Sequence, residues 1–377
     1  MKVLLVGNYE YENSISMRIW ANALHRELVQ LGIDVQLITP RPILGRLKPS
    51  SAGLGKWLGY CDRFLIFPSR LRAAAAQADV VHICDHGCAM YALQLNGKPV
   101  LVTCHDMLAV RGALGEIPEL RPSFWGRYLQ RWIQKGLEHA RLVACVSSFT
   151  LADARRILKH GDLRLVLNGL NYPFRTLPPQ EAERRLAHVQ GISKPFVFHI
   201  SSGQQRKNGE GVLRIFAESV KRTELQLVVA GQPLSPALLQ LARELEVHHR
   251  IVQVLTPPVD VVEALYNRAI ALLFPSRLEG FGWPSIEAQA CGCPVVASDI
   301  PPLVEVLGAS AVIKPLEDEA GMADAISRLA TDREYRDEIR RRGLQNASSR
   351  FQISRMMDEY LSLYRELACQ AYPGSAS

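Results

Sequence analysis

Short apolar runs alternate with helical patterns along almost the whole chain, and this alternation constrains the fold most. The runs expected to form strands are 3–6, 35–38, 80–83, 100–103, 142–146 and 163–167 in the first half, and 196–200, 225–229, 251–254, 271–274 and 295–297 in the second. Between them lie stretches with apolar residues at helical spacing, such as 16–31. This β–α alternation is typical of parallel sheets covered by helices. We therefore expect an α/β protein with two doubly wound, Rossmann-like domains.

The length of 377 residues suits two domains, each with its own core. We expect an N-terminal domain at 1–172, an interdomain segment at 173–194, a second domain at 195–352 and a helix within 353–377. Prolines at 173, 178 and 179, followed by a charged run, are typical of a connecting segment.

Composition narrows the class of protein. Hydrophobic residues make up 48% and charged residues 21% of the chain, an ordinary soluble balance. No uninterrupted apolar run reaches the roughly 18 residues that a membrane span needs. Residues 1–6 read as a buried strand, which leaves no room for a secretory signal before it. The sequence thus predicts a cytoplasmic location.

The net charge of +7 is unevenly distributed. Residues 1–172 hold 21 basic and 13 acidic side chains, whereas the remainder holds 23 and 24. A basic first half indicates an anionic partner. Nucleic acid is not expected as that partner, because the chain contains no RNA- or DNA-binding motif.

The eight cysteines contain no CxxC pair. The run His82-Ile-Cys-Asp-His86-Gly-Cys88 would place several ligand types on one face of a strand. Its spacing matches no usual structural zinc pattern, and it follows a buried strand. We therefore expect buried free thiols and no metal site here.

Two carboxylates bracket a glycine-containing loop that runs into a short helix. Glu279 follows a strand, and Glu287 is expected in the first turn of a helix in which Pro284 takes the first position. Gly292 suits the left-handed cap that ends this helix. Glycines allow backbone N–H groups to approach a ligand, and a helix N-terminus favours phosphate. A carboxylate for sugar hydroxyls, a phosphate site and a second carboxylate together predict a nucleotide-sugar site.

The run PSRLEGFGWPSIEAQACGCPVVASD at 275–299 resembles the E-x7-E signature of the retaining glycosyltransferases of family 4. The resemblance extends to the His105-Asp106 pair at a strand end, to the serines of Val-Ser-Ser at 146–148 and to the Asn168-Gly169 turn. It implies the GT-B fold, with two facing Rossmann-like domains and a C-terminal helix that crosses back to the first. It further implies a hexosyltransferase that moves a hexose from a nucleoside diphosphate-sugar to a saccharide or lipid-linked acceptor, with an α-linkage.

The resemblance also implies roles for single residues. Arg206 and Lys207 would hold the diphosphate, and His105 would contact the donor sugar near the reacting centre. Glu279 would accept the sugar hydroxyls, and Glu287 the two ribose hydroxyls. Further donor contacts are expected from Gly280, Phe281, Gly282, Ser285 and Ile286.

Two departures from the family pattern concern the ligand loops. Many relatives carry an arginine directly after the first strand of the second domain, where this chain has Ser201 and Ser202. The first loop is acidic and aromatic instead of glycine-rich. It predicts an acceptor pocket, although a solvated polar loop fits the pattern equally well. The acceptor candidates are Tyr9, Glu10, Glu12 and Asp106.

No Asp-x-Asp triplet occurs, which argues against a divalent-metal clamp on the diphosphate, and no cofactor is expected. Two alternatives stay open. One is another GT-B-like enzyme, a sugar-nucleotide epimerase or a phosphorylase. The other is a non-catalytic, membrane-associated protein that binds nucleotide sugars.

Basic residues also lie beside Trp and Leu in two stretches, 46–72 and 121–135. This combination suits helices that lie on an anionic membrane surface, here on its inner, cytoplasmic face. It suits equally well two amphipathic helices that pack their aromatic faces into the domain.

Overall fold

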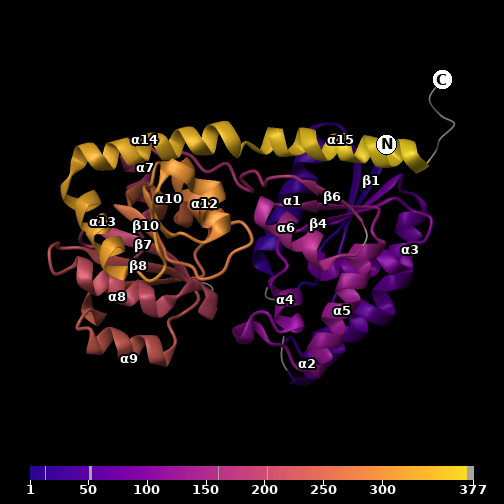
Figure 1. Ribbon diagram of the computed structural model, residues 1–377, viewed down its shortest axis with the longest axis horizontal. Helices are drawn as coiled ribbons and strands as arrows, with labels where there is room; N and C mark the ends of the chain where they lie inside the picture. Colours follow the sequence, from indigo (N-terminus) through magenta and orange to yellow (C-terminus); the bar gives the residue numbers. More distant parts are fainter. Residues whose placement is uncertain (13, 51–52, 160, 202, 372–377) are drawn as a thin grey trace. The chain divides into compact units, whose positions relative to one another are not determined.

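The structure, a computed structural model, describes residues 1–371 except 13, 51–52, 160 and 202 (Figure 1). The chain divides into two compact units. Unit 1 comprises Met1–Tyr172 together with the chain from Ile353 onward, and unit 2 comprises Pro173–Gln352. The C-terminal helix α15 therefore belongs to the unit that begins the chain.

Unit 1 contains a parallel sheet that has six strands within the described residues. The strand order is β2-β1-β3-β4-β5-β6. The strands are β1 Lys2–Val6, β2 Asp34–Ile38, β3 Val80–Ile83, β4 Val100–Cys104, β5 Leu142–Cys145 and β6 Asp162–Leu165. The α-helices are α1 Ile15–Gln30, α2 Gly53–Cys61, α3 Phe67–Ala76, α4 Leu108–Leu114, α5 Phe124–His139, α6 Ser148–Ile157 and α15 Ile353–Ala371. The 3₁₀ segments are η1 Gly45–Leu47, η3 His86–Gln94 and η4 Pro118–Leu120, and η2 Asp62–Ile66 is a π-helix.

Helix α15 is bonded to this sheet through buried polar side chains. Tyr364 lies 2.7 Å from Nδ1 of His82 on β3, and Thr103 on β4 lies 2.8 Å from Nε2 of the same ring. Tyr360 pairs with the Thr103 hydroxyl at 2.8 Å. Because all four side chains are fully buried, each depends on the others for its hydrogen bonds.

Unit 2 contains a second parallel sheet, again of six strands within the described part of the chain, in the order β12-β11-β10-β7-β8-β9. The strands are β7 Phe196–Ser201, β8 Gln226–Gly231, β9 Ile251–Leu255, β10 Ala271–Phe274, β11 Val295–Ser298 and β12 Val312–Lys314. The α-helices are α7 Pro179–Leu186, α8 Gly209–Ser219, α9 Pro236–Glu244, α10 Val259–Arg268, α11 Trp283–Ala290, α12 Pro301–Leu307, α13 Glu319–Thr331 and α14 Arg333–Arg350. The 3₁₀ turns are η5 Gln205–Lys207, η6 His248–Arg250 and η7 Gly308–Ser310.

The predicted α/β class with two parallel, doubly wound sheets is confirmed. In unit 1 the strand order reverses between β1 and β3, and in unit 2 between β7 and β10. In sheets of this kind, ligands bind outside the carboxyl ends of the strands at that reversal. The loops that leave β7 and β10, and those that leave β1, β3 and β4, are therefore the places to look for function.

Candidate active site

Glu279 is held by two cations at the carboxyl ends of β7 and β10. Its Oε1 accepts a hydrogen bond of 2.6 Å from Nζ of Lys207, and its Oε2 accepts one of 2.8 Å from Nη1 of Arg206. The Lys207 ammonium also lies 4.5 Å from the centre of the Phe274 ring, a cation–π contact. The loops after β7 and β10 therefore meet in one charged cluster at the reversal of strand order.

Burial and charge oppose each other within this cluster. Burial alone would raise the pKa of Glu279, but Lys207 and Arg206 outweigh it and hold that pKa below its usual value. Burial lowers the pKa of Lys207, and the Glu279 carboxylate only partly opposes the shift. Removing one partner would leave a buried charge uncompensated, which is strongly unfavourable.

Arg277 and Asn208 fix the two loops against each other. The backbone N–H of Arg277 donates to the Arg206 carbonyl at 2.8 Å, and its guanidinium donates to Oδ1 of Asn208 at 3.1 Å. Asn208 has a left-handed backbone with φ of 56° and caps α8 by accepting from Gly211 N–H. This brings a third cation near the cluster. In this chain Ser201 and Ser202 stand where many relatives carry an arginine, so that position supplies no positive charge. Ser202 lies outside the described residues.

Glu287 lies in the second turn of α11, not in the first turn as expected. The helix begins at Trp283, one residue before Pro284, so Glu287 is its fifth residue. The Tyr266 hydroxyl donates to the Glu287 carboxylate at 3.1 Å. Burial raises the pKa of Glu287 to about 7, against the smaller effect of that hydrogen bond.

The glycine loop before α11 needs the backbone freedom of Gly282. This residue has φ of 96°, and a Cβ at this position would lie 2.5 Å from Cδ2 of Leu303. The Gly282 carbonyl accepts from both the backbone N–H and the hydroxyl of Ser285, at 3.0 and 2.6 Å. The Ser285 N–H, expected to face phosphate, is thus engaged within the turn, and Ile286 is fully buried. Gly292 has the predicted left-handed backbone at the end of α11.

His105 lies at the end of β4 in unit 1 and is buried. Its Nε2 pairs with the Cys84 carbonyl at 3.0 Å, which makes this nitrogen the proton-bearing one. The Trp20 ring packs edge-on against it with the ring centres 5.0 Å apart. Burial lowers the pKa of His105, so the imidazole is neutral at neutral pH.

His86 lies between two carboxylates beside His105, and sequence reasoning did not select it as a site residue. Its Nδ1 lies 3.2 Å from Asp85 and its Nε2 lies 3.7 Å from Asp106. Burial would lower the pKa of His86, but Asp85 raises it to about 9, so the ring is an imidazolium at neutral pH. Asn8, in the loop after β1, donates to the same Asp85 at 2.5 Å.

The loop after β1 carries two tyrosines, of which Tyr9 points inward and Tyr11 is partly exposed. Tyr9 is buried and its hydroxyl donates to Asp62 at 2.9 Å, and Glu12 forms an ion pair of 2.5 Å with Arg63. Glu10 is exposed and its backbone carbonyl accepts from Arg18. Of the acceptor candidates in this loop, Glu10 therefore has the most exposed side chain.

Comparison with known proteins identifies the family. Residues 19–172 match the family model "Glycosyltransferase Family 4", and residues 183–346 match "Glycosyl transferases group 1". The D-inositol 3-phosphate glycosyltransferase of Saccharomonospora viridis is 30% identical over 305 residues, covering 74% of this chain and 67% of that protein. The chain belongs to glycosyltransferase family 4. Its resemblance to that family is confirmed, and it is a nucleotide-sugar glycosyltransferase.

A further sequence relative and two solved structures are similar to the glycosyltransferase. The O-antigen chain mannosyltransferase B of Escherichia coli is 27% identical over 282 residues, which is 73% of this chain and 72% of that protein. Sucrose-phosphate synthase from Thermosynechococcus elongatus has the same fold, with a TM-score of 0.78, 20% identity, and coverage of 98% of this chain and 100% of that one. Anabaena HepE, solved with UDP and glucose, has a TM-score of 0.75, 16% identity, and coverage of 97% and 100%. The fold is GT-B.

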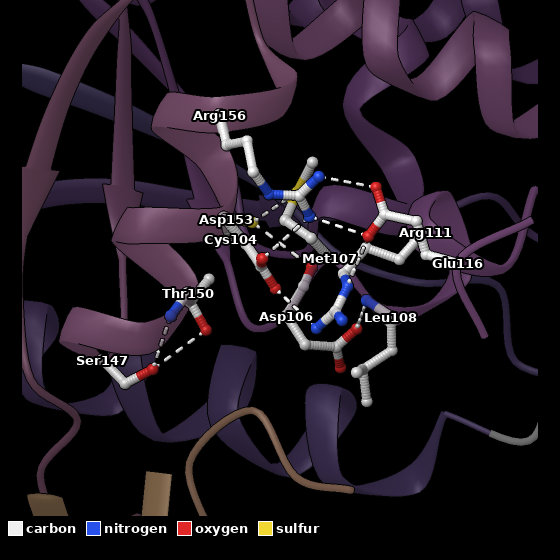
Figure 2. Close-up of polar contacts among 10 residues, drawn as sticks. All are labelled: Cys104, Asp106, Met107, Leu108, Arg111, Glu116, Ser147, Thr150, Asp153 and Arg156. Atoms are coloured by element: carbon white, nitrogen blue, oxygen red, sulfur yellow. Dashed lines mark hydrogen bonds and ion pairs between the residues drawn. The ribbon is translucent and has the colours of Figure 1, made fainter. Parts of the chain in front are cut away.

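In the glycosyltransferase, Asp106 begins a polar assembly that orders the segment after β4 (Figure 2). Its Oδ1 accepts from the Leu108 N–H at 3.0 Å, at the start of α4. Two arginines and two carboxylates then join α4 to α6. Arg111 pairs with Glu116 and with Asp153, each at 3.0 Å. Arg156 pairs with Glu116 at 2.6 Å and with Asp153 at 3.1 Å. These contacts fix the start of the segment that carries Asp106.

Ser147 caps α6 in the glycosyltransferase. Its hydroxyl oxygen accepts from the Thr150 N–H at 3.0 Å and lies 2.9 Å from the Thr150 hydroxyl (Figure 2). The serine run that resembles the family pattern thus includes the helix cap that Ser residues commonly provide.

The expected site residues of the glycosyltransferase fall into two groups. Arg206, Lys207 and Glu279 are in direct contact in unit 2, and Glu287 lies on the following helix of the same unit. His105, Asp106 and the loop after β1 belong to unit 1. Sequence reasoning missed Arg277 and His86. Each had a local signal, because Arg277 lies within the matched run and His86 follows a strand end.

None of the helices in the described residues is long and apolar enough to cross a membrane.

Proposed function

We propose that this enzyme is a retaining hexosyltransferase that forms an α-linkage from a nucleoside diphosphate-hexose without a metal ion. The observation that carries the proposal is the position of Glu279 between Lys207 and Arg206 at the strand-order reversal of unit 2. Relatives named as a mannosyltransferase and as D-inositol 3-phosphate glycosyltransferases support a hexose donor. We propose a saccharide or lipid-linked acceptor, and a place on the cytoplasmic face of a membrane.

The ion pairs around Glu279 suggest how the donor enters. The Glu279 carboxylate pairs with both cations, and a diphosphate carries charge of the same sign as this carboxylate. The diphosphate would take the place of Glu279 on Lys207 and Arg206, and the released carboxylate would accept the hydroxyls of the hexose. Glu287 would accept the ribose hydroxyls. Charge that develops on the leaving phosphate would then meet cations that are already in position, where they contribute most to catalysis.

His105 has a separate proposed role. A neutral, buried imidazole whose proton lies on Nε2 toward the Cys84 carbonyl cannot repel the oxocarbenium-like sugar as an imidazolium would. We propose that His105 contacts the donor sugar and that the charged His86 does not take this role.

The experiment combines donor screening with product analysis. Thermal-shift measurements with UDP-, GDP- and ADP-hexoses select the donor, and NMR of the anomeric proton in the product determines the linkage. We expect an α-product from an α-donor and full activity in EDTA. A β-linked product, or activity lost in EDTA and restored by a divalent cation, would overturn the corresponding part of the proposal.

A further inference from the structure

Unit 1 exposes large apolar side chains along two helical segments. Six large hydrophobic side chains there are between 56% and 74% exposed. They are Leu54, Trp57, Leu65, Phe124, Trp125 and Tyr128. We refer to this surface, carried by residues 53–66 and 121–135, as the amphipathic face. Large exposed apolar patches in soluble proteins usually mark interaction sites.

Ring contacts join the two segments into one surface. Trp57 contacts Tyr60 with ring centres 5.6 Å apart, and Tyr60 contacts Phe64 at 5.4 Å. Phe64 in turn contacts Trp132 on α5 at 5.2 Å. Trp125 and Tyr128 precede Trp132 by seven and four residues, a spacing that places all three on the same side of that helix. Phe64 belongs to η2, which directly follows α2, so its contact with Trp132 joins the first segment to α5.

The charges around this face are almost all positive. Residues 121–135 contain four basic side chains and no acidic one. Residues 41–72 contain seven basic side chains and one acidic one, Asp62, which is buried. Trp and Tyr together with Lys and Arg are the residues found where proteins meet the headgroup region of a bilayer. The charge favours anionic lipid over a neutral surface.

The inner side of the same segment holds the loop after β1. Asp62 accepts from the Tyr9 hydroxyl at 2.9 Å and from the backbone N–H groups of Leu44 at 2.8 Å and Gly45 at 2.9 Å. The next residue, Arg63, pairs with Glu12 at 2.5 Å and lies 5.1 Å from the centre of the Phe64 ring. One segment therefore presents apolar side chains to solvent and fixes the acceptor candidates from within.

We propose that the amphipathic face docks on an anionic lipid bilayer and that Asp62 and Arg63 hold the loop after β1 next to that bilayer. The acceptor is then an amphiphile anchored in the same membrane, and its polar head is presented to this loop. The statement about the acceptor rests on the proposed function, whereas the docking itself does not.

Vesicle sedimentation tests the docking in the absence of donor and acceptor. The chain of 377 residues should bind phosphatidylcholine vesicles that contain phosphatidylglycerol, and this binding should weaken with salt. Phe124→Ser with Trp125→Ser should lower partitioning about 100-fold, because two large apolar side chains are removed. Arg131→Ala with Lys135→Ala should lower it about 25-fold.

A matched control lies on α1 of the same unit, where Val29 is 54% exposed and the Arg26 side chain is 48% exposed. Val29→Ser with Arg26→Ala should bind vesicles as the unmodified protein does. Calorimetry with a nucleoside diphosphate should give unchanged binding for all three double variants, which separates loss of docking from misfolding and from failure of the donor site. Equal vesicle binding by all variants, or none by the unmodified protein, would overturn the docking.

Two further measurements test whether the partner of the amphipathic face is a bilayer and whether the loop after β1 lies next to that bilayer. A concentration-dependent dimer that Phe124→Ser with Trp125→Ser converts to monomer would assign the face to a second copy of the chain and overturn the proposal. In a background with Cys61→Ser and Cys369→Ser, a fluorophore on Glu10→Cys should be quenched by spin-labelled headgroups more than the same fluorophore on Val29→Cys. Equal quenching would overturn the placement of the loop at the bilayer.

Discussion

At the scale of single residues, Glu279 determines how the donor must bind. Two cations share one carboxylate; Lys207 and Glu279 are buried, and the Arg206 side chain is 26% exposed. Without the carboxylate, the cations would be unneutralised and would attract any phosphate more strongly. Nucleotide affinity and turnover should therefore respond to Glu279 in opposite directions.

We expect Glu279→Gln to tighten nucleoside diphosphate binding by about tenfold and to lower turnover by at least about 100-fold. The amide cannot neutralise Lys207 or Arg206, and it orients the hexose hydroxyls poorly. Calorimetry and steady-state rates measure the two effects. Glu210→Gln, an exposed acid on α8, should change neither. Weaker nucleotide binding in Glu279→Gln would contradict the exchange of partners proposed for the cations.

Glu287 makes donor binding depend on pH. Its pKa of about 7 means that the free enzyme partly holds a proton at neutral pH, whereas ribose hydroxyls favour the ionised carboxylate and lower that pKa. Donor binding should therefore release a proton from Glu287. Affinity for a nucleotide sugar should weaken about tenfold for each pH unit below 7. Calorimetry in buffers of different ionisation enthalpy measures the proton. An identical pH dependence in Glu287→Gln would show that another group is responsible.

The same carboxyl should influence stability. An unfolded Glu has a pKa of 4.5, whereas the folded pKa is about 7, so the folded state binds a proton that the unfolded state releases. Stability therefore falls as pH rises between these two values and levels off above the higher one. Glu287→Gln should raise the free energy of unfolding above pH 7 by on the order of 3 kcal/mol. Urea unfolding across this window checks the sign, and equal stability of the two proteins at pH 8 would refute it.

At the scale of elements, the turn that begins α11 positions the donor residues. Gly282→Ala meets both a positive φ and a Cβ contact of 2.5 Å with Leu303, so we expect a loss of about 2–3 kcal/mol in stability and weaker donor binding. Gly115→Ala is the matched control, because Gly115 has a left-handed backbone with φ of 86° and open space around the added carbon. It should cost about 1 kcal/mol and leave donor binding unchanged. Thermal unfolding and calorimetry compare the two variants.

The helices and strands also show which parts of the fold could be predicted from the sequence. The long apolar runs predicted the buried strands, because strands covered on both faces leave a continuous apolar pattern. Strand β12 was missed, since its three residues are only half-buried and too short for any periodicity. Glu287 was placed one residue too early in α11, and so in the first turn, because Pro284 was taken as the first helical residue. The inward position of Tyr9 depends on Asp62, 53 residues away, which no local pattern reveals.

At the scale of the whole molecule, buried polar pairs connect the end of the chain to its beginning. Tyr364→Phe would leave Nδ1 of buried His82 without the tyrosine hydroxyl. We expect a loss of about 1–3 kcal/mol, because the lost hydrogen bond leaves a buried polar atom unsatisfied. Tyr128→Phe, on the exposed side of α5, should stay within about 0.5 kcal/mol of the unmodified protein. Denaturant unfolding that shows no difference between the two variants would contradict this role of α15.

The return of α15 to unit 1 has a consequence for biosynthesis. The ribosome makes residues in order, so the sheet of unit 1 is complete in sequence while the helix that pairs with His82 and Thr103 is still unmade. All of unit 2 is translated in between. Domains usually fold as they emerge. Here the first unit keeps exposed apolar surface and unpaired polar groups until α15 has left the ribosome. A nascent chain stalled before Ile353 should therefore be a preferred chaperone substrate.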